Sequence, residues 1–165
     1  MIGDRWGVRD EEVVREYPCD RFVVAPALRA WRGVTIEAPA ERVWPWVAQI
    51  RVAPYSYDWI DNGFRRSPRR LVDLAEPQVG EPFTTCAGRK LGSIVAVEQG
   101  VQLTGRIMGG CASYLLVPES PERTRLLLKV VMQVNPLVAA GLTLGDLVMA
   151  RRQLLNLKRL AEAPG

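Results

Sequence analysis

Five extended segments in the second half of the chain restrict its fold more than any other feature. They cover residues 81–86, 92–97, 101–108, 111–117 and 123–134, and turn-forming residues separate the later ones at 98–100, 109–110 and 118–121. Because short turns place neighbouring strands antiparallel, these segments predict a β-meander. In the last segment Arg125 and Lys129 alternate with leucine and valine, which predicts one apolar face and one face in water.

Strand and helix signals precede this meander. A strand is predicted over 29–37, and Ala38-Pro39 closes it. The spacing of apolar residues over 41–50 predicts a helix, with Pro45 tolerated in its first turn. A second short helix is predicted over 55–63, with Gly63 as its stop. Residues 1–28 read as an irregular segment with one short helix around 11–16, wrapped outside a single domain over 29–162.

A long helix is predicted at the end of the chain. Asn135-Pro136 is a good helix start, and the firm part of the helix runs from about 144 to 161. Gly141 and Gly145 make a break near its beginning plausible. The complete order, β-α-α-β-β-β-β-β-α, predicts an α+β domain in which a sheet of about six strands curves around one helix. Side chains cannot fill such a space completely, so we expect a cavity between sheet and helix that suits a small apolar molecule.

Composition excludes several kinds of chemistry. The 165 residues contain no histidine, so histidine bases, Ser–His and Cys–His nucleophile pairs and most catalytic zinc sites are excluded. The three cysteines, Cys19, Cys86 and Cys111, are widely spaced and predict buried thiols rather than a disulfide or a metal site. No glycine-rich phosphate motif joins a strand to a helix, and no cofactor is implied. Without a signal sequence or a spanning apolar run, the protein is expected in the cytoplasm.

The formal net charge of +4 is partly concentrated in Arg65-Arg66-Ser67-Pro68-Arg69-Arg70. Pro68 favours an exposed, solvated loop there. Contact with phosphate groups or an anionic lipid is the alternative. Specific binding to nucleic acid is not indicated, because no aromatic RNA-binding signature accompanies the arginines. A partner-binding adaptor that uses this loop is a further possible role.

Several segments of the chain resemble bacterial proteins of the SRPBCC superfamily. They are Trp6-Gly7, residues 36–46, the Tyr-Ser-Tyr-Asp-Trp run at 55–59, and residues 124–126 and 148–155. This superfamily includes START-like lipid carriers and polyketide cyclases. The resemblance implies the helix-grip fold, with a curved antiparallel sheet on a long carboxy-terminal helix and two short helices after the first strand. The chain departs from the pattern at Arg51-Val52-Ala53-Pro54, where relatives carry a glycine-rich approach, and this predicts a stiffer loop at the pocket mouth.

Candidate site residues lie on the predicted second helix. There Tyr55, Asp58 and Trp59 share one face and Tyr57 lies to the side, so that a phenol, a carboxylate and an indole could meet a ligand. Asp58 would act as acceptor or general base, and a tyrosine as proton donor. The structural alternative is that Trp59 fills the core while Asp58 caps a helix or pairs with an arginine.

Three further residues are candidates for ligand contact. On the terminal helix Arg151 projects into an apolar stripe formed by Leu144, Leu147, Val148 and Leu155. A buried guanidinium needs a partner, which would be an aspartate (Asp58, Asp61 or Asp73) or an anionic group of a ligand, unless Arg151 reaches solvent. Arg106 and Tyr114, in adjacent predicted strands, are weaker candidates.

Two functions from different classes follow from these observations. The first is a monomeric or homodimeric protein that binds a lipid, polyketide or related apolar metabolite without changing it. The alternative is a cyclase, aromatase or dehydratase that acts on such a ligand, with Asp58 or a tyrosine moving the proton and Arg151 steadying an enolate.

Overall fold

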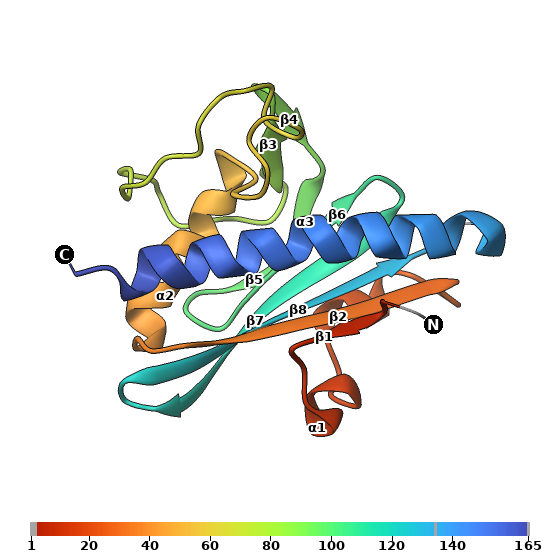
Figure 1. Ribbon diagram of the computed structural model, residues 1–165, viewed down its shortest axis with the longest axis horizontal. Coiled ribbons are helices and arrows are strands. Elements are labelled where there is room, and N and C mark those ends of the chain that lie inside the picture. Colours follow the sequence, from red (N-terminus) through yellow and green to blue (C-terminus); the bar gives the residue numbers. More distant parts are fainter. Residues whose placement is uncertain (1–2, 134, 165) are drawn as a thin grey trace.

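A six-stranded sheet forms the centre of this α+β molecule (Figure 1). The computed structural model describes residues 3–133 and 135–164, and for residues 136–147 it describes the backbone alone. The sheet order is β1-β2-β8-β7-β6-β5. Its strands are β1 (Arg5–Trp6), β2 (Leu28–Ile36), β5 (Ser93–Glu98), β6 (Gln102–Ile107), β7 (Gly110–Ser120) and β8 (Arg123–Met132).

The sheet is mixed, whereas the sequence predicts an antiparallel one. From β2 to β5 every pair is antiparallel, and the long β7–β8 and β2–β8 ladders carry most of the hydrogen bonds. The short β1 lies parallel to β2, with Arg5 opposite Trp31. A parallel pair requires a long connection, and the chain between β1 and β2 supplies one by crossing the outer face of the sheet.

The predicted strand over 81–86 does not join the main sheet. Only Thr84–Cys86 is extended (β3), and it pairs with β4 (Arg89–Leu91) in a separate two-stranded sheet. Gly92 separates this hairpin from β5, with a φ of 67°. A Cβ atom at Gly92 would lie 2.1 Å from the carbonyl oxygen of Arg106, so the chain can turn there only because the residue is glycine.

Two long helical segments cover the inner face of the sheet. α2 (Ala40–Ala48) continues into the short helix η2 (Gln49–Arg51). Pro45 lies in the second turn of α2, whereas the sequence predicts it in the first turn. α3 (Pro136–Glu162) is one continuous helix, so the predicted break at Gly141 and Gly145 is wrong. Figure 1 shows α3 lying along the sheet with α2 at its carboxy-terminal end. Leu144 and Leu147 of the predicted stripe lie outside the described side chains.

The second short helix predicted over 55–63 is also wrong. This segment forms turns, with one helical hydrogen bond from the Asp61 N–H to the Tyr57 carbonyl. Gly63 and Phe64 both take positive φ values, 56° and 63°, which ends any helix at once. Side-chain bonds within the segment, described below, replace the helical ladder.

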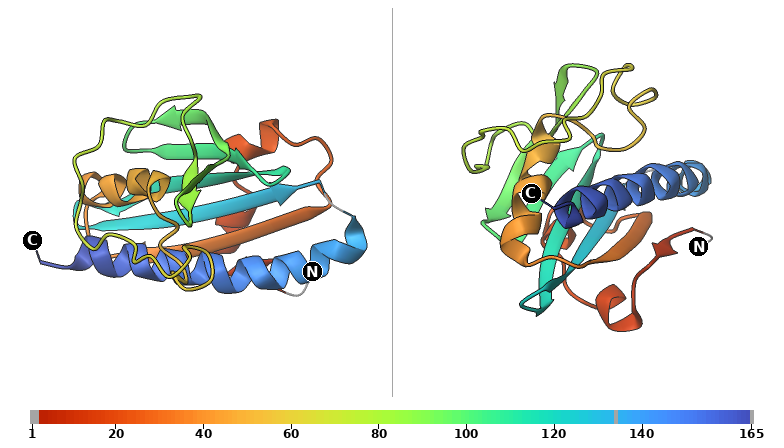
Figure 2. Two further views of the ribbon diagram at one scale, coloured as in Figure 1. Left: turned by 90° about the horizontal axis from the view of Figure 1, so that it is seen from above. Right: turned by 60° about the vertical axis from the view of Figure 1, so that its left-hand side comes forward.

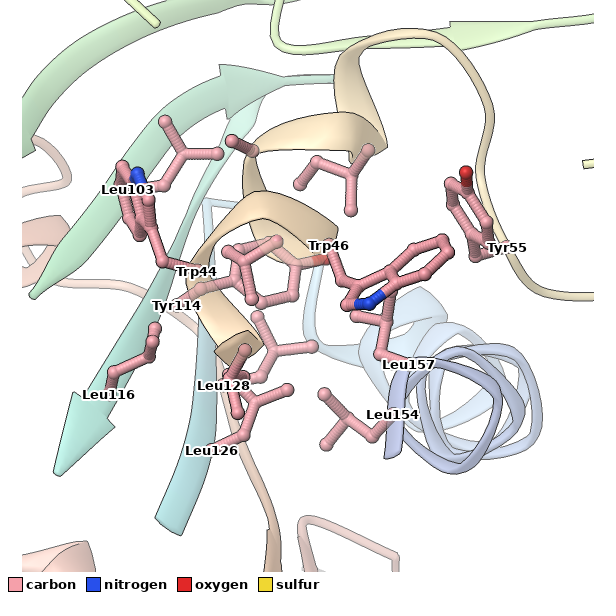
Figure 3. Close-up of a cluster of buried hydrophobic side chains, with 14 of the residues drawn as sticks. Trp44, Trp46, Tyr55, Leu103, Tyr114, Leu116, Leu126, Leu128, Leu154 and Leu157 are labelled. Atoms are coloured by element: carbon pink, nitrogen blue, oxygen red, sulfur yellow. The ribbon is translucent and has the colours of Figure 1, made fainter. Parts of the chain in front are cut away.

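Apolar side chains of the described residues pack between the sheet and the two helices (Figure 3). Each fully buried leucine contributes about 1.5–3 kcal/mol to folding, because its apolar surface is removed from water. The aromatic members pack edge to face, as with the rings of Trp46 and Tyr55 at 6.4 Å. This inner core includes Trp44, Trp46, Tyr55, Leu103, Tyr114, Leu116, Leu126, Leu128, Leu154 and Leu157.

The outer face of the sheet is covered as well, which corrects the prediction of a face in water. The N-terminal segment, residues 3–27, includes the helix α1 (Asp10–Val13) and the short helix η1 (Pro18–Arg21). It packs Tyr17 and Cys19 against Leu127 and Val131 of β8. Arg125 and Lys129 are only 5% exposed, because carboxylates of this segment cover them.

Two ion pairs join this segment to β8. The Arg125 Nε and Nη2 atoms lie 2.7 and 2.6 Å from the two Glu12 carboxylate oxygens. The Lys129 Nζ lies 2.7 Å from Asp20, above the rings of Tyr17 and Trp31. Arg125 and Lys129, which the sequence predicts to face water, are therefore buried and paired with carboxylates.

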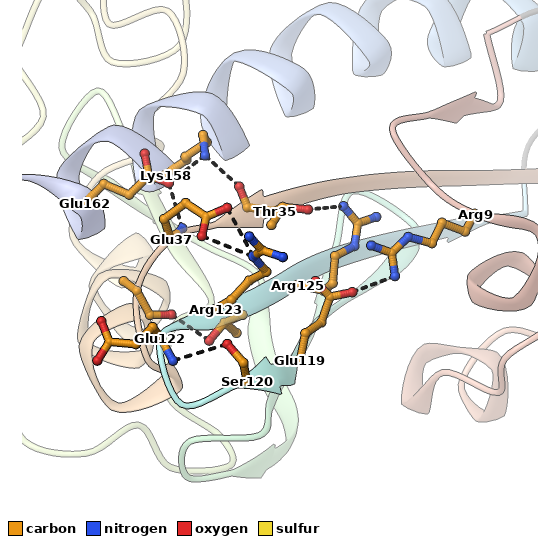
Figure 4. A network of polar contacts seen from close by, with 12 residues as sticks. Arg9, Thr35, Glu37, Glu119, Ser120, Glu122, Arg123, Arg125, Lys158 and Glu162 are labelled. Carbon is orange, nitrogen blue, oxygen red and sulfur yellow. Dashed lines mark hydrogen bonds and ion pairs between the residues drawn. The ribbon is translucent and has the colours of Figure 1, made fainter.

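Polar contacts fix the carboxy-terminal end of α3 to the edge of the sheet (Figure 4). Lys158 donates to the Thr35 carbonyl of β2 and pairs with Glu162. Glu162 accepts from the Glu37 N–H, and Glu37 pairs with Arg123 at the start of β8. The last two turns of α3 thus have a defined position relative to β2.

Candidate functional site

A cleft of about 430 Å³ lies between residues 55–69 and the carboxy-terminal half of α3. We call it the α3 cleft. Figure 2 (left) shows the segment that follows α2 crossing over α3. The lining consists of Tyr55, Ser56, Tyr57, Asp58, Trp59, Ser67, Pro68, Arg69, Arg152, Asn156, Arg159 and Leu160.

The cleft combines aromatic surface with positive charge. Trp59 is 62% exposed, and its ring meets that of Tyr57 edge to face at an interplanar angle of 76°, with centroids 6.5 Å apart. The Arg152 guanidinium lies 5.7 Å from the Tyr57 ring centroid, a cation–π arrangement. Arg69, Arg152 and Arg159 face a single carboxylate, that of Asp58, so the lining carries a net positive charge.

Asp58 fixes the shape of the loop. One carboxylate oxygen accepts the Ser67 N–H at 2.9 Å, and the other accepts the Ser67 hydroxyl at 2.5 Å. The Tyr55 N–H donates in turn to the Ser67 Oγ. These bonds close residues 55–67 into a compact loop, and the carboxylate has a structural role.

Tyr55 is the residue through which the loop meets the core. It is 2% exposed, its hydroxyl accepts a bond from the Gln49 side chain, and its carbonyl accepts one from Asn156 of α3. Figure 3 shows its ring beside Trp46 and above α3. Burial raises the pKa of Tyr55 to about 12, which keeps its phenol protonated at neutral pH.

The structure brings four of the predicted site residues together. Tyr55, Tyr57, Asp58 and Trp59 all line the α3 cleft, although they lie on a loop rather than a helix. The indole of Trp59 is exposed, so it does not fill the core as the structural alternative required.

Three predicted residues lie elsewhere. Arg106 lines a different cavity, of about 520 Å³, at the end of the sheet and stacks on Phe22. Tyr114 is buried in the inner core, where its hydroxyl donates to Gln153. Arg151 is exposed and lies over the Trp6 ring at 5.2 Å, so the predicted buried cation is wrong. Trp6 belongs to the edge strand β1, and its ring contacts the Arg151 guanidinium without covering it from water.

Sequence reasoning missed the contribution of α3 to this cleft. Arg152, Asn156 and Arg159 are spaced by four and three residues and so lie on one face of the helix. This spacing of polar residues along one helix face is a signal that the sequence contains. Ser67 and Arg69 had no comparable signal, because a loop has no period.

The described residues give no sign of a metal centre or a membrane span. Their cysteine, aspartate and glutamate side chains form no group of three or more that could hold a metal ion. Within the described part of the chain, every helix is too short or too polar to cross a bilayer.

Comparison with known proteins supports the fold alone. The sequence matches no protein-family model and no curated protein. Among solved structures, a Nitrosospira multiformis protein is similar with a TM-score of 0.57 and 12% identity, over 79% of this chain and 94% of that one. The KanY protein matches with a TM-score of 0.56 and 12% identity, over 85% and 100%. A Nitrosomonas europaea protein matches with a TM-score of 0.54 and 17% identity, over 85% and 97%.

Proposed function

We propose that this chain is a START-like helix-grip protein that binds a small hydrophobic ligand, with the α3 cleft as the binding site. The observation that carries the proposal is the meeting of exposed aromatic surface and three arginines in one cleft. Described side chains fill the space under α3, where Leu154 and Leu157 are fully buried. The α3 cleft lies at the rim of this packed region, and four of the seven predicted site residues line it.

The lining favours an amphipathic ligand of modest size. Trp59, Pro68 and Leu160 offer apolar surface to a chain or ring system. Arg152 and Arg159 would hold a carboxylate or phenolate, since a guanidinium binds such groups through paired hydrogen bonds. Lipids and polyketides with an acidic end have this chemistry.

A fluorescent fatty acid, 11-(dansylamino)undecanoic acid, provides the test. We expect the Trp59→Ala variant to bind it at least about tenfold more weakly, because burying an indole is worth well over 1.4 kcal/mol. The matched control is Phe64→Ala, which removes an exposed aromatic ring from the same loop but outside the cleft. Equal affinity of wild type and Trp59→Ala would refute the assignment. Native mass spectrometry of the purified protein would identify a natural ligand.

The adjacency of Tyr57 and Asp58 supports a second candidate, an enzyme of the cyclase, aromatase or dehydratase kind. Here Asp58 would accept a proton and Tyr57 would donate one. Two hydrogen bonds from Ser67 occupy both oxygens of the Asp58 carboxylate, so a ligand would have to compete with Ser67 for this group. The enzyme proposal fails if Asp58→Asn and Tyr57→Phe both convert the co-purifying ligand as fast as wild type.

A further inference from the structure

Exposed apolar side chains are concentrated in one segment of the chain. Of the twelve large hydrophobic residues that are exposed in the described part of the chain, seven lie between residues 59 and 79. Ile60 is 54% exposed and Phe64 is 81% exposed. Single exposed apolar residues are common, but such a concentration indicates an interaction surface.

Six cationic side chains accompany them. Arg65, Arg66, Arg69 and Arg70 follow Phe64 directly, and all four are exposed. The β3–β4 hairpin adds Arg89 and Lys90, both exposed. None of the six forms an ion pair with a carboxylate of residues 3–133 or 135–164. We call Ile60, Phe64 and these six residues the basic-apolar surface.

The two segments of this surface lie side by side. The Ala87 N–H donates to the Asn62 side chain at 3.3 Å, and Gly63 lies against the Ala87 methyl group. The guanidinium of Arg65 covers Gly88. Figure 1 shows the β3–β4 hairpin and the segment that follows α2 together above α3.

The backbone holds this surface in place. Phe64 has a φ of 63°, a strained value for a bulky residue, and its N–H donates to the Asp58 carbonyl at 2.9 Å. The Asn62 side chain donates to the Arg65 carbonyl at 2.7 Å. A strained backbone is kept where neighbouring bonds enforce it, so the exposure of Phe64 is a built feature of the loop.

Acidic residues in the same segments do not cancel the positive charge. Asp58 accepts two hydrogen bonds from Ser67, and Asp61 lies partly buried in the same loop. Asp73 and Glu76 follow further along the chain, and Glu76 accepts a bond from the Trp44 indole. The six cations therefore outnumber the four carboxylates of residues 58–76.

We propose that the basic-apolar surface docks on an anionic lipid bilayer. Arginines near a membrane are attracted by the negative surface potential, while phenylalanine and isoleucine enter the boundary between head groups and acyl chains. A nucleic acid is the less suitable partner, because five of the seven exposed apolar residues in 59–79 are aliphatic and offer a base no ring to stack on. The docking surface does not depend on the proposed ligand binding, although Arg69 borders both.

Sedimentation with lipid vesicles tests this proposal. We expect the wild-type protein to bind vesicles of phosphatidylcholine with about one-third phosphatidylglycerol, and to bind pure phosphatidylcholine weakly. Ile60→Ser/Phe64→Ser and Arg66→Glu/Arg70→Glu should each lower the partition coefficient about tenfold or more. Higher ionic strength should weaken binding as well.

Matched variants separate this surface from general effects of charge and hydrophobicity. Val14→Ser/Val24→Ser removes two side chains that are each 84% exposed, and Arg15→Glu/Arg29→Glu makes the same change in net charge at exposed arginines elsewhere. Both controls should bind vesicles like wild type. The proposal is overturned if controls and test variants lose binding equally, if anionic lipid has no effect, or if single-stranded RNA binds more tightly than vesicles. The four substituted residues do not line the α3 cleft, so the dansyl-probe affinity reports separately on ligand binding.

Discussion

At the scale of single residues, Glu12 joins the N-terminal segment to the outer face of the sheet through a buried ion pair with Arg125. It is 4% exposed, and its carboxylate faces the Arg125 guanidinium through two short hydrogen bonds. It also accepts the Arg9 N–H at 2.8 Å. Burial opposes the charge on Glu12, but the bonds from Arg125 and Arg9 outweigh it, and the pKa is lowered.

A lowered pKa makes the stability of the protein depend on acidity. The ionised Glu12 stabilises the folded state fully above the pKa of the unfolded chain, about 4.3 for a glutamate. This contribution is lost as the pH falls through the lower folded pKa. We therefore expect the free energy of unfolding, measured with urea, to decrease between about pH 5 and pH 3.

The variant Glu12→Gln serves as the reference for this titration, because its side chain carries no proton to lose. Its free energy of unfolding should be lower at neutral pH and should change less with acidity than that of wild type. An unchanged slope in this variant would show that other carboxylates cause the acid sensitivity.

At the scale of elements, the N-terminal segment acts as a lid on the outer core. Cys19, in η1 of this segment, and Cys111, in β7, are fully buried where the segment meets the sheet, whereas Cys86 in β3 is half-buried. Burial raises the pKa of Cys19 to about 12 and that of Cys111 to about 11. A buried thiol with a raised pKa reacts only after its cover opens.

Thiol labelling therefore reports on this segment. Cys86 should react first with a disulfide reagent, and Cys19 and Cys111 should follow at a common, slower rate set by opening. Glu12→Gln should accelerate the two slow cysteines at least about tenfold, since it leaves Arg125 buried without its anion. Peptide mass spectrometry distinguishes the three sites. If Cys111 reacts as fast as Cys86, the segment does not protect the sheet.

The N-terminal segment also shows where sequence reasoning reaches its limit. The strands β5 to β8 and the helix α3 could be predicted, because alternation and turn residues are local signals. The burial of Arg125 could not, since its partner Glu12 lies 113 residues earlier. Alternating charge in a strand is the same pattern whether water or a distant carboxylate covers it.

The sequence predicts the loop residues of the candidate site but not its residues on α3. The Tyr-Ser-Tyr-Asp-Trp run marks the cleft correctly, but its apparent helical face is formed by a loop that Asp58 and Ser67 close. Local hydrogen bonds of aspartate and serine compete with the helix, which hydrophobic spacing does not reveal. The burial predicted for Arg151 is wrong because a helix projection contains no information on neighbouring elements. It cannot show that Arg151 lies beside Trp6 of β1 and remains exposed.

At the scale of the whole molecule, the two faces of the sheet carry separate hydrophobic clusters. One face carries α2, α3 and the α3 cleft, and the other carries the N-terminal segment with its buried charges. Residues that lie far apart and share no partners usually contribute independently, within about 0.3–0.5 kcal/mol. Stability set on the outer face should therefore be separable from binding on the inner face.

Arg125→Met tests this separation. It leaves Glu12 buried without its cation and should lower the free energy of unfolding by about 3–5 kcal/mol. The dissociation constant of the dansyl probe should stay within about twofold of wild type under conditions where the variant is folded. Leu154→Ala is the contrasting variant, because it opens a space beneath α3 next to the cleft and should change both quantities. A tenfold loss of probe affinity in Arg125→Met would mean that the sheet transmits changes from one face to the other, and that the N-terminal segment belongs to the binding site.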